Sequence, residues 1–435
     1  MIILGVLIGL VALLLAVKFP IITLVVFMST NLFKGYLTAR VDFLQRFDLT
    51  VLATLYIIFG IIVSLVKHPD DFRKTVNWPF LVMLLLGFFM LFGLFYSSAP
   101  IYGWAKSSRF LVFGGAMFLA PLLFLRNEFD VKLLLWIFIL AGVLVSVATM
   151  FNIQEERGTF LEANTIGTAE RIGLGILISF CFIINRRSHM LNRLVNGGLL
   201  FVSFVGLIMT GSRGALYALV LCSVIAPFFF GRKVSFYWLI PGVVVGVLGV
   251  GFSMARAEQV TGAAVRRIAV LWQYESGVES AFSTRLPFYS YAISNMPRAP
   301  LVGHGTGAFS TDFGGEDTRR YPHNILLELG YENGLIGLSL FIMLLLMVYR
   351  RWRLCRQCAD RYLGNEMLYI LCSIAGLIFV YLFLQALKSN DIDGNRLLFF
   401  SLGFIVSIYS ISAEQLRSLS AQFYESNNVA NIETA

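Results

Sequence analysis

The chain has 435 residues, of which 58% are hydrophobic and only 14% are charged, and its formal net charge is +9. A soluble protein of this size carries about a quarter of charged residues, so this composition and a mean hydropathy of +0.78 exclude an ordinary soluble fold. The positive charge does not indicate nucleic-acid binding, because the cations cluster between apolar runs and no motif that reads RNA or DNA is present.

The apolar runs recur at lengths that cross a bilayer as helices. The sequence predicts an all-α fold, a polytopic transmembrane helical bundle of 12 or 13 spans with one large external loop. The number depends on whether the two short segments around Lys18 and Pro20 each cross the membrane. The first segment has no basic region and no small-residue cleavage site, so we expect a retained span and not a signal peptide. The predicted spans lie near residues 2–17, 20–34, 48–66, 78–97, 108–125, 131–151, 169–185, 196–211, 214–230, 235–254, 334–350, 367–388 and 395–412.

Arginine and lysine placement predicts the orientation of the bundle. The most basic short loops, 185–193, 231–233 and 350–361, are all cytoplasmic if single crossings alternate between them. That choice places loop 152–168, the turn at 211–213 and segment 255–333 outside the cytoplasm; the N-terminus is then outside for 13 spans and inside for 12. The predicted domains are transmembrane helices 1–254, a large periplasmic loop 255–333, transmembrane helices 334–412 and a polar tail 413–435.

Segment 255–333 is far longer than the usual connection between helices of one bundle. Its apolar spacing predicts amphipathic helices at 259–276 and 286–297, of the kind that lie on a membrane surface. The glycines of "PLVGHGTGAF" predict a tight, exposed loop. A long loop with helices of its own is expected to carry function.

Five cysteines are present, and none lies in the large loop. Cys181, Cys222 and Cys372 fall inside predicted spans, where we interpret them as small buried apolar side chains. Cys355 and Cys358 form a single CxxC, which is a weak metal or redox signal without a second pair or nearby histidines.

Three arginines at the external face are candidate binding residues. Arg213 lies in "MTGSRGALYAL" between two apolar runs, where an arginine either snorkels to the interface or binds an anion with its guanidinium fork. The glycines beside it leave the backbone open to a ligand. Arg285, in "AFSTRLPFY", and Arg171, in "TAERIGLG", are further cations on the same face; a solvated arginine and an interface anchor are the respective alternatives.

His323, in "RYPHNILLELGYENGLIG", is the candidate for acid–base chemistry. Its ordinary pKa lies near physiological pH, and it precedes a predicted helix start whose amide donors would orient an anion. Asn324, Glu328 and Glu332 follow and are available to orient it; the alternative is a solvated loop histidine.

Several chemistries are excluded. The sequence contains no HExxH, no Walker loop, no GxSxG and no clustered aspartates for Mg²⁺ or Ca²⁺, so neither a metal nor a cofactor is expected. Any phosphate handled here must be neutralised by arginines.

Three motifs together resemble the bacterial O-antigen ligase and polymerase superfamily of polytopic membrane proteins. They are "GSRGALYAL", "STRLPFYSYAISNMPRAPLVGHGTGAF" and "HNILLELGYENGLIG", and the last matches the family pattern of His-Asn, Leu-Glu and then Glu-x-Gly-x-x-Gly, which includes Gly334. Their order and spacing fit over about residues 150–350, and the rest of the chain agrees only in hydropathy.

The resemblance implies a metal-independent, inverting glycosyltransferase of the bacterial inner membrane, with its active site on the periplasmic side. The donor would be a glycan on undecaprenyl diphosphate, and the acceptor of the ligases is a sugar hydroxyl of the lipid A–core. The two essential arginines of the family map onto Arg213 and Arg285, and its essential histidine onto His323. These arginines, with Arg171 as a further cation, would bind the diphosphate, and His323 would act as the base.

Other functions stay open at this point. A polymerase would extend another carrier-linked glycan from the same donor, and a protein O-glycan ligase would use a protein hydroxyl as acceptor. A lipid-linked glycan flippase or secondary transporter predicts inverted repeats, broken helices and charges near the bilayer midplane. No clear repeat is visible, and the candidate cations lie at one face.

Overall fold

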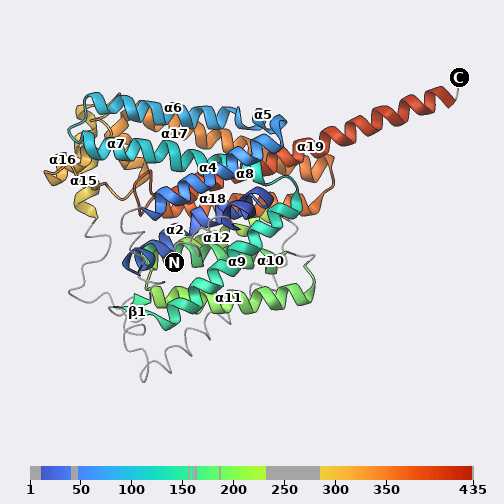
Figure 1. Cartoon of the computed structure of the whole chain (residues 1–435), viewed down its shortest axis with the longest axis horizontal. Helices are drawn as coiled ribbons and strands as arrows, with labels where there is room; N and C mark the ends of the chain where they lie inside the picture. The colour runs from blue at the N-terminus through green and yellow to red at the C-terminus, as the bar shows by residue number, and fades with distance from the viewer. Residues whose placement is uncertain are drawn as a thin grey trace.

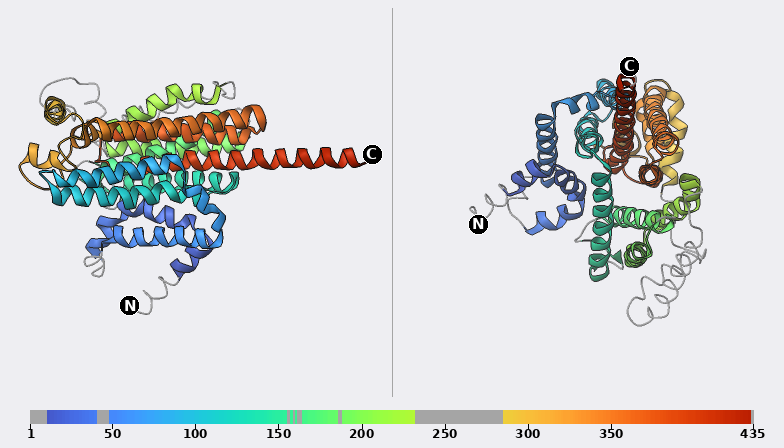
Figure 2. Two further views of the ribbon diagram at one scale, coloured as in Figure 1. Left: turned by 90° about the horizontal axis from the view of Figure 1, so that it is seen from above. Right: turned by 90° about the vertical axis from the view of Figure 1, so that its right-hand side faces the viewer.

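The computed structural model describes residues 11–40, 48–154, 157–158, 160, 164–185, 188–231 and 285–433. In these ranges the chain is a bundle of long helices with one short β-hairpin (Figures 1 and 2). The elements are α2 (Ile21–Arg40), α4 (Leu49–Lys67), η1 (Pro69–Asp71), α5 (Phe72–Thr75), α6 (Trp78–Phe92), η2 (Gly93–Phe95), α7 (Pro100–Arg109), η3 (Phe110–Gly114), α8 (Gly115–Phe124), α9 (Glu128–Phe151), β1 (Ile153–Gln154), β2 (Arg157–Gly158), α10 (Thr165–Ile184), α11 (Met190–Thr210), α12 (Arg213–Phe230), α15 (Leu286–Asn295), η6 (Met296–Arg298), α16 (Ala308–Gly314), α17 (Ile325–Gln357), η7 (Cys358–Tyr362), α18 (Glu366–Ala386) and α19 (Arg396–Glu433).

Eleven helical segments in the described ranges are long and apolar enough to cross a membrane. The prediction of an all-α polytopic bundle is therefore confirmed. The predicted span 235–254 and most of 2–17 lie outside the described residues, although residues 11–18 are helical. The total of 12 or 13 spans stays a prediction.

Two predicted span boundaries are wrong, and both errors have the same cause. The fourth described span begins at Pro100 and not near residue 108, and α17 begins at Ile325 and not near residue 334. Lys106 makes the first segment look too polar for a span, and Glu328 and Glu332 do the same for the second. In the structure these three side chains pair with one another, with Lys106 Nζ 2.5 Å from Glu328 Oε1 and 2.6 Å from Glu332 Oε2.

The centre of the bundle is formed by the spanning parts of α10, α18 and α19, which are mostly buried, whereas α4, α11 and α12 lie nearer its rim. Small residues allow close helix crossings. A Cβ added at Gly142 in α9 would meet the Gly175 Cα in α10 at 3.2 Å, so the two backbones approach closely there. The predicted polar tail continues α19 as helix to Glu433 and projects away from the bundle in Figure 1.

Residues 285–324 form a compact layer over one end of the bundle, which we call the loop end. The predicted amphipathic helix 286–297 is present as α15 and η6, and Ala292 of α15 is buried with Phe309 and Tyr331. Asp312 fixes this layer to the bundle, since it accepts hydrogen bonds from the Ser98 hydroxyl at 2.8 Å and the Tyr331 hydroxyl at 2.7 Å. The predicted helix 259–276 lies outside the described residues.

Gly334 divides α17 into two helical stretches. Its φ of 60° and ψ of −161° are not helical, and a Cβ there would lie 2.4 Å from the Leu301 carbonyl oxygen. The glycine loop predicted at 300–309 fills the break and is mostly buried there, so the expectation that it is exposed is wrong. Leu335 N–H donates to the Pro300 carbonyl at 2.8 Å, and Gly305 N–H donates to the Glu332 carbonyl at 2.9 Å. The break thus keeps its backbone groups paired, as a membrane-embedded helix interruption requires.

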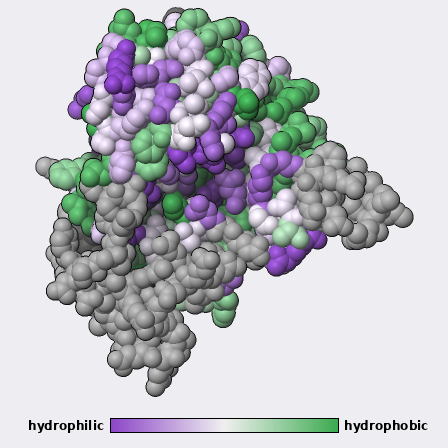
Figure 3. All heavy atoms as spheres, turned by 90° about the vertical axis from the view of Figure 1, so that its left-hand side faces the viewer, coloured by the Kyte–Doolittle hydropathy of each residue, from purple (hydrophilic) through white to green (hydrophobic). Residues whose placement is uncertain are grey.

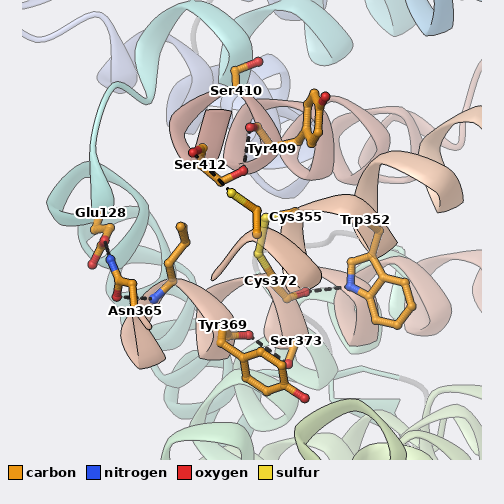
Figure 4. Close-up of a disulfide and its surroundings, with 12 residues drawn as sticks. Glu128, Trp352, Cys355, Asn365, Tyr369, Cys372, Ser373, Tyr409, Ser410 and Ser412 are labelled. Carbon is orange, nitrogen blue, oxygen red and sulfur yellow. Dashed lines mark hydrogen bonds between the residues drawn. A yellow bond between two sulfur atoms is a disulfide. The ribbon is translucent and has the colours of Figure 1, made fainter. Parts of the chain in front are cut away.

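Near the opposite end, a disulfide joins α17 to α18 (Figure 4). It links Cys355 to Cys372, whose Cα atoms are 6.7 Å apart. The interpretation of Cys372 as only a small buried side chain is therefore wrong, because α17 passes directly beside it. Cys358, the other cysteine of the CxxC, lies with its Sγ 3.6 Å from the Ser412 carbonyl oxygen.

Candidate functional site

The sequence-predicted site residues gather at the loop end. Hydrophilic side chains cover much of this end where the described residues form the surface (Figure 3). The loops that carry the most basic segments, after α10 and after α17, lie at the opposite end of the bundle (Figure 1). The candidate arginines and His323 are therefore separated from those loops by the length of the spans.

Arg213 is the first residue of α12 and is half-buried. The preceding Gly211 ends α11 with a φ of 66°, a left-handed conformation that favours glycine. Beside Arg213, Gly214 lets another cation approach: a Cβ at this position would lie 2.1 Å from Lys388 Nζ and 2.6 Å from Lys388 Cδ. The glycine that follows Arg213 thus makes room for the Lys388 side chain.

Lys388 comes from the loop between α18 and α19 and is half-buried. Burial lowers the pKa of its ammonium to about 8; the charge of Glu170 opposes this and the charge of Arg285 adds to it. Lys388 therefore lies within electrostatic range of Arg285, although the two residues are far apart in the sequence.

Arg285 immediately precedes α15 and is also half-buried. Its charge acts on His323 as well as on Lys388. We call Arg213, Arg285 and Lys388 the cation cluster. Among the described residues, no carboxylate lies within ion-pair distance of any of the three.

His323 has a backbone φ of 58°, which is uncommon for a residue other than glycine. Its ring packs edge-on against Phe288 of α15, with centroids 5.7 Å apart, and lies 4.5 Å from the Tyr321 ring. Burial lowers the pKa of the imidazole, and the nearby Arg285 lowers it further, while Asp391 acts in the opposite direction. The ring is consequently neutral at neutral pH and able to accept a proton.

The residues expected to orient His323 make their described side-chain contacts with other groups. Asn324 caps α17, because its Oδ1 accepts from the Leu326 and Leu327 N–H groups at 3.0 and 3.1 Å. Glu328 and Glu332 bind Lys106. These side chains hold the segment that follows His323, while the ring contacts of His323 come from Phe288 and Tyr321.

Arg171 faces a different set of partners. Its guanidinium donates to the Met28 carbonyl at 2.8 Å and to the Gly167 carbonyl at 3.2 Å, and it lies 3.8 Å from Glu170 Oε2. It thus connects α10 to α2. The neighbouring Glu170 acts electrostatically on Lys388, and the role of Arg171 in donor binding stays a prediction.

Sequence reasoning missed the contribution of two segments. One is loop 387–395, "LKSNDIDGN", and the other is Lys106 in α7. Asp391 of this loop is fully buried and binds Arg319, with Arg319 Nε and Nη2 donating to its two oxygens at 2.8 and 2.6 Å. The available signal was the position of a polar, aspartate-rich turn at the external end of two apolar spans.

We call Lys106, Glu328, Glu332, Arg319 and Asp391 the paired cluster. Asp391 accepts a third hydrogen bond, from the Tyr102 hydroxyl at 2.8 Å. Burial alone would raise the pKa of Asp391, but hydrogen bonds from Arg319 and its charge hold that pKa well below the usual range. Each charged group of the paired cluster therefore has an oppositely charged partner within the cluster.

The chemical capacity of the loop end follows from these contacts. Two guanidinium groups and an ammonium, from three separate elements, are suited to bind an anion such as a phosphate ester. The neutral His323 beside them is suited to accept a proton from a hydroxyl. Among the described residues, no group of three or more His, Cys, Asp or Glu side chains is arranged to hold a metal ion.

A scan of protein families agrees with the motifs. Residues 198–342 match the family model described as O-Antigen ligase, a range that includes Arg213, Arg285, His323 and Gly334. None of the curated proteins matches the chain. The resemblance found in the sequence is thereby confirmed: residues 198–342 match the O-antigen ligase family model, on a multi-pass membrane protein.

Proposed function

We propose that this chain is a metal-independent glycosyltransferase of the bacterial inner membrane that acts at its periplasmic face. It transfers a glycan from undecaprenyl diphosphate to a sugar hydroxyl of the lipid A–core. The observation that supports this most is the cation cluster beside a neutral His323. A diphosphate leaving group needs positive charge, and an acceptor hydroxyl needs a base.

In this proposal, Arg213 and Arg285 bind the diphosphate. Negative charge grows on its oxygens as the bond between the anomeric carbon and phosphate breaks, and the guanidinium groups stabilise that charge. Lys388, whose side chain lies against Gly214, adds a third positive charge. The lipid tail lies between helices of the bundle, while α15 covers the reacting groups; the other predicted lid helix, 259–276, lies outside the described residues. A donor-binding role for Arg171 remains part of the proposal.

His323 accepts the proton of the acceptor hydroxyl. The oxygen of that hydroxyl forms a new bond to the anomeric carbon, and undecaprenyl diphosphate leaves with the electron pair of the broken bond. A single displacement of this kind inverts the configuration of the anomeric carbon. The low pKa of the imidazole favours this role, since the base must be unprotonated when the hydroxyl arrives.

The test uses a strain that lacks the gene and carries plasmids for the wild-type chain, His323→Ala or Arg213→Ala. The lipopolysaccharide is separated on a gel, and the amount of each chain in the membrane is measured. We expect wild-type protein to restore capped lipopolysaccharide, and both variants to accumulate normally while leaving the core uncapped and carrier-linked polymer in excess. A core capped with a single repeat in the deletion strain identifies a polymerase instead. Unchanged lipopolysaccharide with a missing protein glycan identifies a protein O-glycan ligase, and wild-type capping by His323→Ala removes the histidine from the reaction.

A further inference from the structure

His323 sits in a backbone conformation that needs external support. A positive φ in a residue other than glycine costs free energy and persists only where the surrounding structure imposes it. The ring itself makes two aromatic contacts, with Phe288 and Tyr321. What holds Tyr321 therefore bears directly on where the imidazole points.

Tyr321 is held by Arg319. The Arg319 guanidinium lies over the Tyr321 ring at 5.6 Å from its centroid, while the ring stands 4.5 Å from that of His323. Contacts with both a guanidinium and an imidazole restrict the position of the phenol ring. Arg319 thus restricts Tyr321, and Tyr321 in turn restricts the ring of His323.

Arg319 is fixed in turn by Asp391. The two make a forked ion pair with contacts of 2.8 and 2.6 Å, and Asp391 is fully buried while the Arg319 side chain is 52% exposed. The Tyr102 hydroxyl donates to Asp391 at 2.8 Å and ties the carboxylate to α7. The fixed partner is therefore the aspartate, and the arginine is the group that it orients.

The same loop also holds the chain on the far side of His323. Ile392 N–H donates to Glu328 Oε1 at 3.2 Å, directly after Asp391 in the sequence. Residues 391 and 392 thus contact the chain before His323, through Arg319, and after it, through Glu328. A loop anchored at both ends of a strained segment restricts the motion of the residue between them.

From these contacts, and resting on the proposed function, we propose that Asp391 and Arg319 are positioning residues for His323. They set the orientation of the imidazole toward the acceptor hydroxyl without touching either substrate. Because Lys388 belongs to the same loop and contacts Gly214, loop 387–395 also places the histidine relative to the cation cluster.

The test uses the purified full chain in detergent, with undecaprenyl-diphosphate-linked O-antigen as donor and lipid A–core as acceptor. Asp391→Asn keeps the shape of the side chain and removes its charge, and Arg319→Lys keeps the charge and loses the fork. We expect each variant to lower kcat by about 10- to 100-fold, as a displaced catalytic group does, with a change of less than about threefold in the KM for the donor. The double variant is expected to lose no more than the worse single variant, because both changes break one ion pair.

The pH profile distinguishes positioning from a merely structural role. The charged groups that act on the imidazole are Arg285, Arg319 and Asp391, and only Asp391 raises its pKa. In Asp391→Asn the acid limb of the kcat profile therefore moves to lower pH, provided that His323 is the base. Arg319→Lys keeps both charges, so its acid limb stays near that of the wild type.

Arg320→Gln is the matched control, because it removes a neighbouring exposed arginine that has no ion pair within the described ranges. It should keep kcat within about twofold. Wild-type kcat in Asp391→Asn, or a loss that appears in the donor KM and not in kcat, overturns the inference. If His323→Ala and Arg213→Ala are inactive while Asp391→Asn is not, only the positioning role fails; if all of them are active, the proposed function fails.

Discussion

Two groups of charged residues lie at the loop end and differ in how their charges are satisfied. In the paired cluster every charge has a partner within 2.8 Å: Lys106 binds two carboxylates, and Arg319 binds Asp391. In the cation cluster the described residues supply no carboxylate within ion-pair distance. The two groups also differ in burial: Lys106, Glu328, Glu332 and Asp391 of the paired cluster are fully buried, whereas all three residues of the cation cluster are half-buried.

The difference shows how structural charge is told apart from functional charge. A buried ion that is fully paired within the protein fixes the geometry of its surroundings, and removing one partner leaves an uncompensated charge. Positive charges that gather without a partner repel each other, and they are tolerated where an anionic ligand completes the site. The paired cluster therefore fixes the geometry of the loop end, and the proposed function assigns the cation cluster to the donor.

The largest expected effect comes from breaking the paired cluster. Lys106→Ala leaves Glu328 and Glu332 buried without their cation, which costs about 3–5 kcal/mol of folding free energy. We expect the variant to fail to accumulate in the membrane, measured by immunoblot and by the elution profile in detergent. Replacing all three residues with uncharged side chains of similar volume should restore accumulation. A folded Lys106→Ala protein at wild-type levels contradicts the structural role.

The next effect comes from the cation cluster. Arg285→Ala removes one of the groups that stabilise the leaving diphosphate, and such a loss costs about 3 kcal/mol, or roughly 100-fold in rate. The initial rate of transfer at saturating donor checks this, and the melting temperature should stay unchanged. Arg298→Ala is the control, since Arg298 is an exposed arginine of the same layer. Equal rates in the two variants would falsify the distinction between the clusters.

Lys388→Ala should have a smaller effect on binding. It removes one of three positive charges, and we expect the donor to bind about tenfold more weakly, which is roughly 1.4 kcal/mol. The KM for the donor and a direct measurement of donor binding report this change. Lys388→Arg keeps the charge and should restore most of the affinity. Unaltered affinity in Lys388→Ala removes this residue from the cation cluster.

The smallest expected effect is a pH dependence in the wild type. Because burial lowers the pKa of Lys388 to about 8, its charge is present below that pH and is lost as the pH rises through it. Donor affinity should therefore fall severalfold between pH 7 and pH 9, approaching that of Lys388→Ala. In Lys388→Arg the affinity should stay constant across this range. A flat profile in the wild type contradicts the link between this ammonium and the donor.

The sequence alone predicts the bundle, its polarity and the arrival of Arg213, Arg285 and His323 at one end, because hydropathy and short motifs report those features locally. It does not predict the paired cluster, since Lys106 and its two glutamates lie on helices that are distant in the chain. Because these three residues are charged, the sequence also places the starts of two spans too late in the chain. Charged residues that pair between distant helices look unpaired when only the sequence is read.

Loop 387–395 shows a second limit. Its aspartates carry no known spacing for a metal or a catalytic pair, and nothing in the sequence links Asp391 to Arg319 or Lys388 to Gly214. From the sequence, Gly214 beside Arg213 is interpreted as access for a ligand. In the structure the space beside this glycine is filled by the Lys388 side chain. Contacts between loops that are joined by different helices depend on the packing of those helices.

The break at Gly334 fixes how His323 is rotated about the helix axis relative to the second half of α17. The stretch from Ile325 to Asn333 is regular helix, closed at one end by the Asn324 cap and at the other by the Gly334 turn and its bonds to Pro300 and Leu301. One residue added within it would rotate His323 by about 100° relative to Gly334, because an α-helix has 3.6 residues per turn. The number of residues in this stretch therefore sets the direction of the imidazole around the helix axis relative to Gly334. A change of length would turn the imidazole relative to the cation cluster.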